Sequence, residues 1–118
     1  MRNLAPGITR ERLLIEGFFL AKVDKKAIEK YFEEITLELG LRMYGDPIIF
    51  SPGGLGKEEN QGYDAFVPLI DSGISLYIWG NQKFLSVILY TCKTFDQTKA
   101  IQVTQEFFQA KEIESMSF

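Results

Sequence analysis

Hydrophobic positions along this chain follow two periods, and the helical period is the clearer one. From Lys25 to Leu39 apolar residues return every three or four positions, as they do on the buried face of an amphipathic helix. Asp24 before this segment is a suitable N-cap, and Gly40 after it is a common stop. The pattern therefore predicts a helix over Lys25–Leu39.

A second segment with helical spacing begins after Asp96 or Thr98, either of which is a suitable N-cap. Its apolar stripe consists of Ala100, Val103, Phe107 and Ala110. A stripe of this length predicts a second amphipathic helix that reaches Ala110.

The other apolar segments have the period or the composition of strands. Residues 73–80 alternate most cleanly, so that every second side chain points to the same side. Gly45 and Pro47 weaken the segment around them, and Pro68 indicates an edge strand or a bulge. Further strands are expected at residues 12–21, 41–50, 63–71, 83–92 and 111–118.

The expected order of elements is β-α-β-β-β-β-α-β within one domain that spans residues 1–118. Two helices with one apolar stripe each are best buried on the same face of a mostly antiparallel sheet. We therefore predict the α+β fold class, as a two-layer α/β sandwich with both helices on one face.

Composition and net charge exclude several classes of function. Apolar residues make up 46% of the chain and charged residues 25%, and the formal net charge is −3 without any basic stripe. Nucleic acid is therefore not an expected partner. The apolar runs are too short to span a membrane, the N-terminal residues do not resemble a signal peptide, and a lone Cys92 fits a reducing compartment. We expect a cytoplasmic protein without a His/Cys metal site, since the chain has no histidine.

Three short stretches could carry chemistry, and each also has a plain structural interpretation. The segment FSPGGLG, which starts at Phe50, permits close approach of a ligand but is equally an ordinary connection. Asp71-Ser72-Gly73 has the composition of a turn between two strands, and a triad of the Ser-His type is excluded without histidine. Cys92 is either a reactive thiol or, more commonly for a free cysteine, a small buried residue.

Taken in order, these stretches resemble a known family. A Phe-x-Pro loop, an acidic-Ser pair before an alternating strand that ends in Trp79, and then YTC with an amphipathic helix are similar to the short bacterial and archaeal S-adenosylmethionine decarboxylases. The resemblance runs from about Arg12 to Glu114. It implies an α/β sandwich, a role in spermidine synthesis, and a homodimer, which the high aromatic content also favours.

The resemblance also implies a cofactor made from the chain itself. Members of the family cleave a Glu-Ser bond, and the serine becomes a pyruvoyl group whose ketone acts as an electron sink while CO₂ leaves. Ser72 matches this serine, Asp71 stands for the preceding glutamate, and Cys92 matches the cysteine that donates a proton. Phe50 resembles the phenylalanine that stacks on adenine, and Trp79 is the second candidate for contact with the substrate.

The sequence departs from the family pattern at four positions. Tyr77 replaces the histidine that removes a proton during self-processing, and Asn81 replaces the glutamate that holds the ribose hydroxyls. A serine of the loop falls on Gly56 or on its neighbour if the alignment has a gap, and the histidine after the cleaved serine is Gly73. Tyrosine, with a pKa of about 10, is a poor base near neutral pH.

Two classes of function stay open. The chain is either a divergent pyruvoyl decarboxylase, acting on S-adenosylmethionine or another amino acid, or a module that is not processed. The second would bind a small amine or nucleoside-like ligand, or regulate a catalytic paralogue by forming a dimer with it. A weaker alternative uses the same pocket for other chemistry on S-adenosylmethionine without a pyruvoyl group.

Overall fold

The computed structural model describes the backbone of residues 1–118 and every side chain except that of Asn60. Its two helices are α1 (Lys25–Leu39) and α2 (Gln97–Phe108), and a single 3-10 turn, η1, covers Glu58–Asn60. The strands are β1 (Glu11–Phe19), β2 (Ile48–Phe50), β3 (Gly62–Leu69), β4 (Ser72–Trp79), β5 (Phe84–Thr91) and β6 (Ala110–Ser117).

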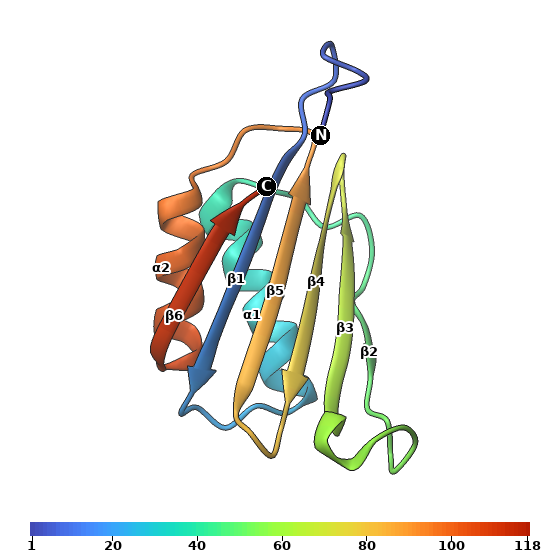
Figure 1. The fold of residues 1–118 in the computed structure, drawn as a ribbon, viewed down its shortest axis with the longest axis vertical. Coiled ribbons are helices and arrows are strands. Elements are labelled where there is room, and N and C mark those ends of the chain that lie inside the picture. Colours follow the sequence, from blue (N-terminus) through green and yellow to red (C-terminus); the bar gives the residue numbers. More distant parts are fainter.

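The strands form one sheet in the order β2-β3-β4-β5-β1-β6, and every neighbouring pair is antiparallel. Both helices lie on the same face of the sheet, as Figure 1 shows. This confirms the predicted α+β sandwich and its order of elements. Among the described residues, no helix is both long and apolar enough to cross a membrane.

The helix ends follow from local hydrogen bonds. The side chain of Asp24 accepts the backbone N–H of Ala27 at 2.8 Å, and Gly40 ends α1 in the left-handed conformation with φ 68°. Asp96, rather than Thr98, caps α2 by accepting the N–H of Lys99 at 3.0 Å.

Two sequence-based boundaries are wrong. Helix α2 ends at Phe108 because Gln109 takes the left-handed conformation with φ 53°, and Ala110 is the first residue of β6. Of the expected strand 41–50, only Ile48–Phe50 forms a strand, and an isolated bridge joins Met43 to Leu69. The glycine and proline between these two pieces interrupt the ladder.

Pro68 lies in β3 beyond the three residues that pair with β2, so no β2 residue pairs with it. A proline has no N–H to donate, and its place past the end of β2 avoids the loss of a ladder hydrogen bond. Its carbonyl still accepts the N–H of Tyr44 at 2.8 Å. The prediction of an edge-like position is therefore correct for this end of the strand.

The core lies between the sheet and the two helices. Inward residues of the four central strands, among them Ile15, Ile74 and Val87, are fully buried. The helices contribute an aromatic group in which the rings of Tyr31 and Phe108 lie 4.7 Å apart, and the Tyr31 hydroxyl is 2.8 Å from that of Thr104. Burial of this many rings gives a short chain one dense core.

The buried hydroxyl of Tyr31 makes stability depend on alkaline pH. Burial raises the pKa of Tyr31 well above its ordinary value, although the hydrogen bond with Thr104 opposes the shift. The unfolded chain ionises Tyr31 at a pKa of about 10, so the stabilisation is complete below that pH and is lost as the pH rises above it.

We expect the free energy of unfolding to fall more steeply above pH ~10 in the wild type than in Tyr31→Phe, by about 1.4 kcal/mol per pH unit. Near neutral pH the same variant is expected to lose about 1 kcal/mol, because the hydrogen bond between Tyr31 and Thr104 is lost while Thr104 still donates to the Ala100 carbonyl. Denaturant titrations at neutral and alkaline pH measure both effects. Tyr90→Phe, at an exposed tyrosine, is the control. Parallel pH profiles for wild type and Tyr31→Phe would contradict the assignment.

The face of the sheet opposite the helices is not covered by any element of the chain (Figure 1). We call it the open face. Cross-strand pairing arranges its side chains in rows, one of which runs through Phe66, Ser75, Ile88, Leu14 and Met116. Exposed rings and aliphatic side chains on this face include Phe18, Phe66, Tyr77, Tyr90, Met116 and Phe118. The candidate site residues lie on this face or at its ends.

Candidate functional site

The turn between β3 and β4 contains the Asp71–Ser72 peptide bond, the candidate for self-cleavage. Leu69 pairs with Ser72, so only Ile70 and Asp71 connect the two strands. Asp71 has φ 60°, in the left-handed region. This conformation costs an L-residue on the order of 1–2 kcal/mol, although aspartate tolerates it better than most. The residue on the amino side of Ser72 is thus held in a strained conformation by a two-residue turn.

The carbonyl of Asp71 already has a hydrogen-bond donor. The backbone N–H of Cys92 donates to the carbonyl oxygen of Asp71 at 2.9 Å. This N–H is held in place by a turn after β5, where the hydroxyl of Thr91 accepts the N–H of Lys93 at 2.9 Å and donates to the carbonyl of Lys93. A backbone donor placed on a carbonyl stabilises negative charge that develops on its oxygen.

The hydroxyl of Ser72 is buried and has no hydrogen-bond partner in the described part of the chain. A buried hydroxyl without a partner costs about 1–3 kcal/mol, so its presence calls for a reason. Ser72 is directly bonded to the carbonyl carbon of Asp71, and its Oγ is the nearest nucleophile in sequence. The Ser72 hydroxyl and the Asp71 carbonyl are thus adjacent, and the carbonyl oxygen accepts a backbone N–H.

Residues of this turn line a cavity of about 360 Å³, which we call the Ser72 hollow. It is lined by Phe66, Asp71, Ser72, Gly73, Ser75, Ile88, Tyr90 and Cys92. Cys92 is exposed there, so the interpretation of it as a small buried residue is wrong. The reason is that β5 ends at Thr91 and the chain turns outward at the next residue.

Glycine at position 73 has a steric reason. A Cβ on residue 73 would lie 2.9 Å from a ring carbon of Phe66, closer than real contacts allow. The ring of Phe66 therefore occupies the space that a larger side chain would need. Where the family pattern has a histidine, this chain has Gly73, and the Phe66 ring of the neighbouring strand lies beside it.

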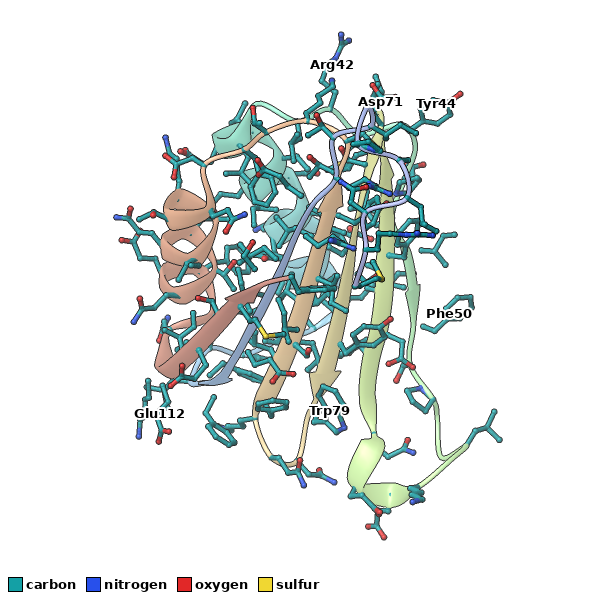
Figure 2. All side chains as sticks on the ribbon, turned by 45° about the horizontal axis from the view of Figure 1, so that its top comes forward. Arg42, Tyr44, Phe50, Asp71, Trp79 and Glu112 are labelled. Carbon is teal, nitrogen blue, oxygen red and sulfur yellow. The ribbon has the colours of Figure 1, made fainter. Side chains whose placement is uncertain are left out.

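A second cavity, of about 460 Å³, lies at the other end of β4, and we call it the aromatic hollow. Figure 2 shows Asp71 and Trp79 at opposite ends of this strand. Phe50 pairs with Asp64, and Asp64 pairs with Tyr77, which brings a carboxylate between two aromatic rings. The full lining is Phe50, Pro52, Leu55, Gly56, Lys57, Asp64, Tyr77, Ile78 and Trp79.

The loop that borders the aromatic hollow is fixed by one side chain. The amide oxygen of Gln61 accepts the N–H of Gly54 at 3.0 Å, and its amide nitrogen donates to the carbonyls of Leu55 and Lys57 at 2.8 and 3.1 Å. The glycine-rich segment is therefore held by hydrogen bonds to Gln61 and forms one side of a cavity, beyond connecting β2 to β3.

The structure separates the sequence-predicted residues into two groups. Asp71, Ser72 and Cys92 line the Ser72 hollow. Phe50, Tyr77 and Trp79 line the aromatic hollow. Asn81 lines neither, because it is exposed in the turn between β4 and β5. Five residues along a strand separate Ser72 from Tyr77, which is about 16 Å.

Sequence reasoning missed Asp64, the only carboxylate in the aromatic hollow. The alternation of β3 places Asp64 on the same face as Phe66, which was visible in the sequence. Its pairing with Tyr77 also follows once the turn is known to hold only Ile70 and Asp71, because turn length fixes the register of a hairpin.

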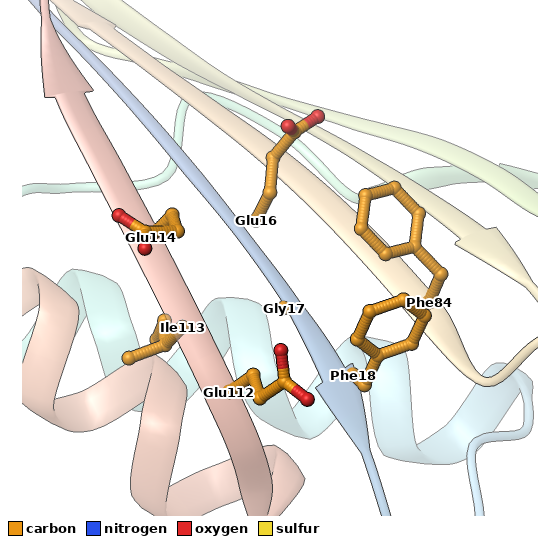
Figure 3. Close-up of a pocket in the computed structure, with 7 residues that line it drawn as sticks. All are labelled: Glu16, Gly17, Phe18, Phe84, Glu112, Ile113 and Glu114. Atoms are coloured by element: carbon orange, nitrogen blue, oxygen red, sulfur yellow. The ribbon is translucent and has the colours of Figure 1, made fainter.

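A third cavity, of about 390 Å³, lies across β1 and β6 on the open face (Figure 3). Its carboxylates are those of Glu16, Glu112 and Glu114, and Phe18 and Phe84 form its other side. Glu16 accepts a hydrogen bond from the hydroxyl of Ser86 at 2.9 Å. Among the described side chains, no three carboxylate or thiol groups lie close enough together to hold a metal ion.

The chain is similar to known proteins in sequence profile and in fold. A family profile described as S-adenosylmethionine decarboxylase matches residues 20–118. The crystal structure of the adenosylmethionine decarboxylase from Aquifex aeolicus VF5 superposes with a TM-score of 0.72. The two share 18% sequence identity, and the superposition covers 94% of this chain and 89% of that chain, which shows a common fold. No curated protein matches the sequence.

Proposed function

Because the chain belongs to the S-adenosylmethionine decarboxylase family, we propose that it cleaves itself between Asp71 and Ser72 and decarboxylates S-adenosylmethionine or a related amino acid. One observation carries the proposal. The Ser72 hydroxyl is buried without a partner, beside a carbonyl that the N–H of Cys92 holds at 2.9 Å. A turn with no chemical role would gain nothing from an unsatisfied buried hydroxyl.

Cleavage proceeds in two steps on the chain itself. Ser72 Oγ attacks the Asp71 carbonyl carbon, the C–N bond breaks, and an ester replaces the amide while the nitrogen takes up the hydroxyl proton. A base then removes the Cα proton of residue 72 and the Cβ–O ester bond breaks, so that Asp71 leaves with a new C-terminal carboxylate. Water replaces the remaining nitrogen as ammonia and leaves a ketone at residue 72. The N–H of Cys92 stabilises the oxyanion in the first step, and relief of the left-handed Asp71 favours it.

The residues around Ser72 fit a pyruvoyl group at that position. Formation of a pyruvoyl group removes the buried hydroxyl that has no partner, and Gly73 places no side chain beside residue 72 on the open face. A pyruvoyl group supplies an electron sink for the loss of CO₂ from an amino acid. Cys92, exposed in the same hollow, is the proton donor at the reacting carbon.

The aromatic hollow is the proposed site for the nucleoside part of the substrate. Phe50 and Trp79 offer ring faces for stacking, and Asp64 offers a carboxylate to hydroxyl groups or to a positive charge. Asn81 lies outside the hollow, so Asp64 replaces the ribose-binding role that the resemblance assigned to residue 81.

We propose that a homodimer completes the site. Within one chain Ser72 and Tyr77 lie about 16 Å apart along β4, although the linings of the two hollows come within two residues of each other on β3 and β4. A two-fold contact between two open faces would place the aromatic hollow of one copy over the Ser72 hollow of the other. It would also bury exposed rings such as Phe18 and Phe66, which are 46% and 42% exposed in the single chain.

We expect Leu14→Lys to abolish this dimer, because Leu14 lies in the middle of the open face and lines neither hollow. A charge there would be buried without a partner. Light scattering after size exclusion should give twice the 13.5 kDa chain mass for the wild type and one chain mass for the variant. Leu37→Lys, the same change on the exposed surface of α1, should remain dimeric. A monomeric wild type would contradict the contact.

A second candidate function rests on Tyr77. Tyrosine stands where the family has its processing histidine, and no residue that lines the Ser72 hollow is an ordinary base except Asp71. Under this alternative the chain stays intact and binds a small ligand in the aromatic hollow, or pairs with a catalytic paralogue. Release of CO₂ from carboxyl-labelled S-adenosylmethionine by wild-type protein supports the decarboxylase. Binding of S-adenosylmethionine with no release from it or from other amino acids supports the alternative.

A further inference from the structure

Three of the four arginines of this acidic chain meet at one end of β1. Arg2, Arg10 and Arg12 line a cavity of about 220 Å³ between the N-terminal arm and the strand, which we call the arginine hollow. Figure 1 shows the arm rising past the ends of the strands at this point. No carboxylate side chain lines the hollow. Such a concentration of positive charge is unexpected in a chain of net charge −3.

No carboxylate forms an ion pair with these guanidinium groups in the described part of the chain. The ion pair found there joins Lys99 to Glu38 at 3.3 Å. Arg10 donates to the side-chain oxygen of Asn3 and to the carbonyl of Ala5, and these contacts fix its position. Nε of Arg12 is buried and has no hydrogen-bond partner. A buried donor of a charged group is costly unless something accepts from it.

The arginine hollow also adjoins the Ser72 hollow. Arg12 pairs across the sheet with Tyr90, and Tyr90 pairs with Gly73. Two strand spacings, or about 10 Å, therefore separate the backbone of Arg12 from that of Gly73. The guanidinium of Arg12 lies 5.5 Å from the centre of the Phe118 ring, which holds it over the same face.

We propose that the arginine hollow binds a small anion, a carboxylate or phosphate group, through Arg10 and Arg12. A planar guanidinium with paired N–H donors matches either group in a two-point contact. The cavity is smaller than a site for a drug-sized molecule, so it suits a single anionic group and not a nucleotide. The acidic remainder of the chain disfavours a polyanion. The site does not depend on self-cleavage.

Calorimetric titration with inorganic phosphate, and separately with acetate, tests the site at constant ionic strength. The uncleavable Ser72→Ala protein is titrated beside the wild type, so that failure of self-cleavage and failure of anion binding are seen separately. We expect saturable binding of at least one anion to both proteins. Arg12→Gln and Arg10→Gln should each weaken it about tenfold. Arg42→Gln, outside the hollow, should leave it unchanged.

The conservative change Arg12→Lys keeps the charge but loses the fork, so it should weaken binding less than Arg12→Gln does. Competition with S-adenosylmethionine identifies the source of the anion. Mutual displacement assigns the hollow to the carboxylate of the substrate, and independent binding assigns it to a separate anion. No saturable binding, or equal losses in Arg12→Gln and Arg42→Gln, would overturn the proposal. The proposal would also be overturned if Arg12→Gln dissociated the dimer while phosphate had no effect on the wild type. The arginines would then pair with a second copy of the chain.

Discussion

Ser72→Ala protein is expected to remain one chain of residues 1–118, while the wild type separates into residues 1–71 and 72–118. The variant loses the only atom that can attack the Asp71 carbonyl from within the turn. It keeps the strained φ of Asp71 and the N–H of Cys92, so the fold around the bond is retained. The methyl group of alanine also removes an unsatisfied buried hydroxyl, and the variant should therefore be no less stable than the uncleaved wild type.

Ser75→Ala is the matched control for this variant. Ser75 lies on the same strand as Ser72 and lines the same hollow, but it points to the opposite face of the sheet and its hydroxyl is three residues from the turn. We expect Ser75→Ala protein to be cleaved as the wild type is. Denaturing electrophoresis and intact mass distinguish one chain from two. Cleavage of Ser72→Ala, or loss of cleavage in Ser75→Ala, would show that the nucleophile is a different group.

Cys92→Ala protein is expected to cleave itself but to release CO₂ about 10²–10⁴ times more slowly than the wild type. The two outcomes separate because two different parts of Cys92 act in the two reactions. Its backbone N–H, which any residue except proline retains, holds the Asp71 carbonyl at 2.9 Å. Its thiol, exposed in the Ser72 hollow, donates the proton that replaces CO₂.

Cys92→Pro tests the backbone N–H of residue 92. Proline removes the N–H that contacts the Asp71 carbonyl, so cleavage itself should slow by about 10²–10³, the usual effect of losing one oxyanion donor. Circular dichroism checks that the turn after β5 still allows folding. If Cys92→Ala fails to cleave, or decarboxylates at the wild-type rate, the division of roles between thiol and backbone is wrong.

The sequence was sufficient where local signals agree. Asp24 and Gly40 bracket an unbroken apolar stripe, and α1 has the predicted boundaries because both caps form. The alternation of β4 was also readable, since its inward residues Ile74, Leu76 and Ile78 are nearly fully buried. Such features depend on neighbours in the chain and need no knowledge of the fold.

Other features depend on contacts that a single sequence does not contain. Gln109 ends α2 in a left-handed conformation although glutamine has no preference for it, because β6 must turn back to pair with β1. The sequence left Cys92 open between a reactive thiol and a small buried residue, and its exposure is decided by the end of β5 at Thr91.

The candidate site shows the same division. The family pattern located Ser72 and Cys92 in sequence, but their link through the Asp71 carbonyl is a long-range hydrogen bond. Asp64 and Arg12 carry no motif. Alternation indicates the face on which each lies, but only strand pairing places Asp64 beside Tyr77 and Arg12 beside Tyr90.

The intact mass of freshly purified wild-type protein, followed over prolonged incubation, tests self-cleavage most directly. We expect the mass of residues 1–118 to give way to that of residues 1–71 and to that of a second fragment that begins at residue 72. This second fragment should lack a free amino terminus and should gain the mass of one hydrazine reagent less one water when its new ketone forms a hydrazone. A single mass for residues 1–118 that persists unchanged would contradict self-cleavage, and with it the decarboxylase.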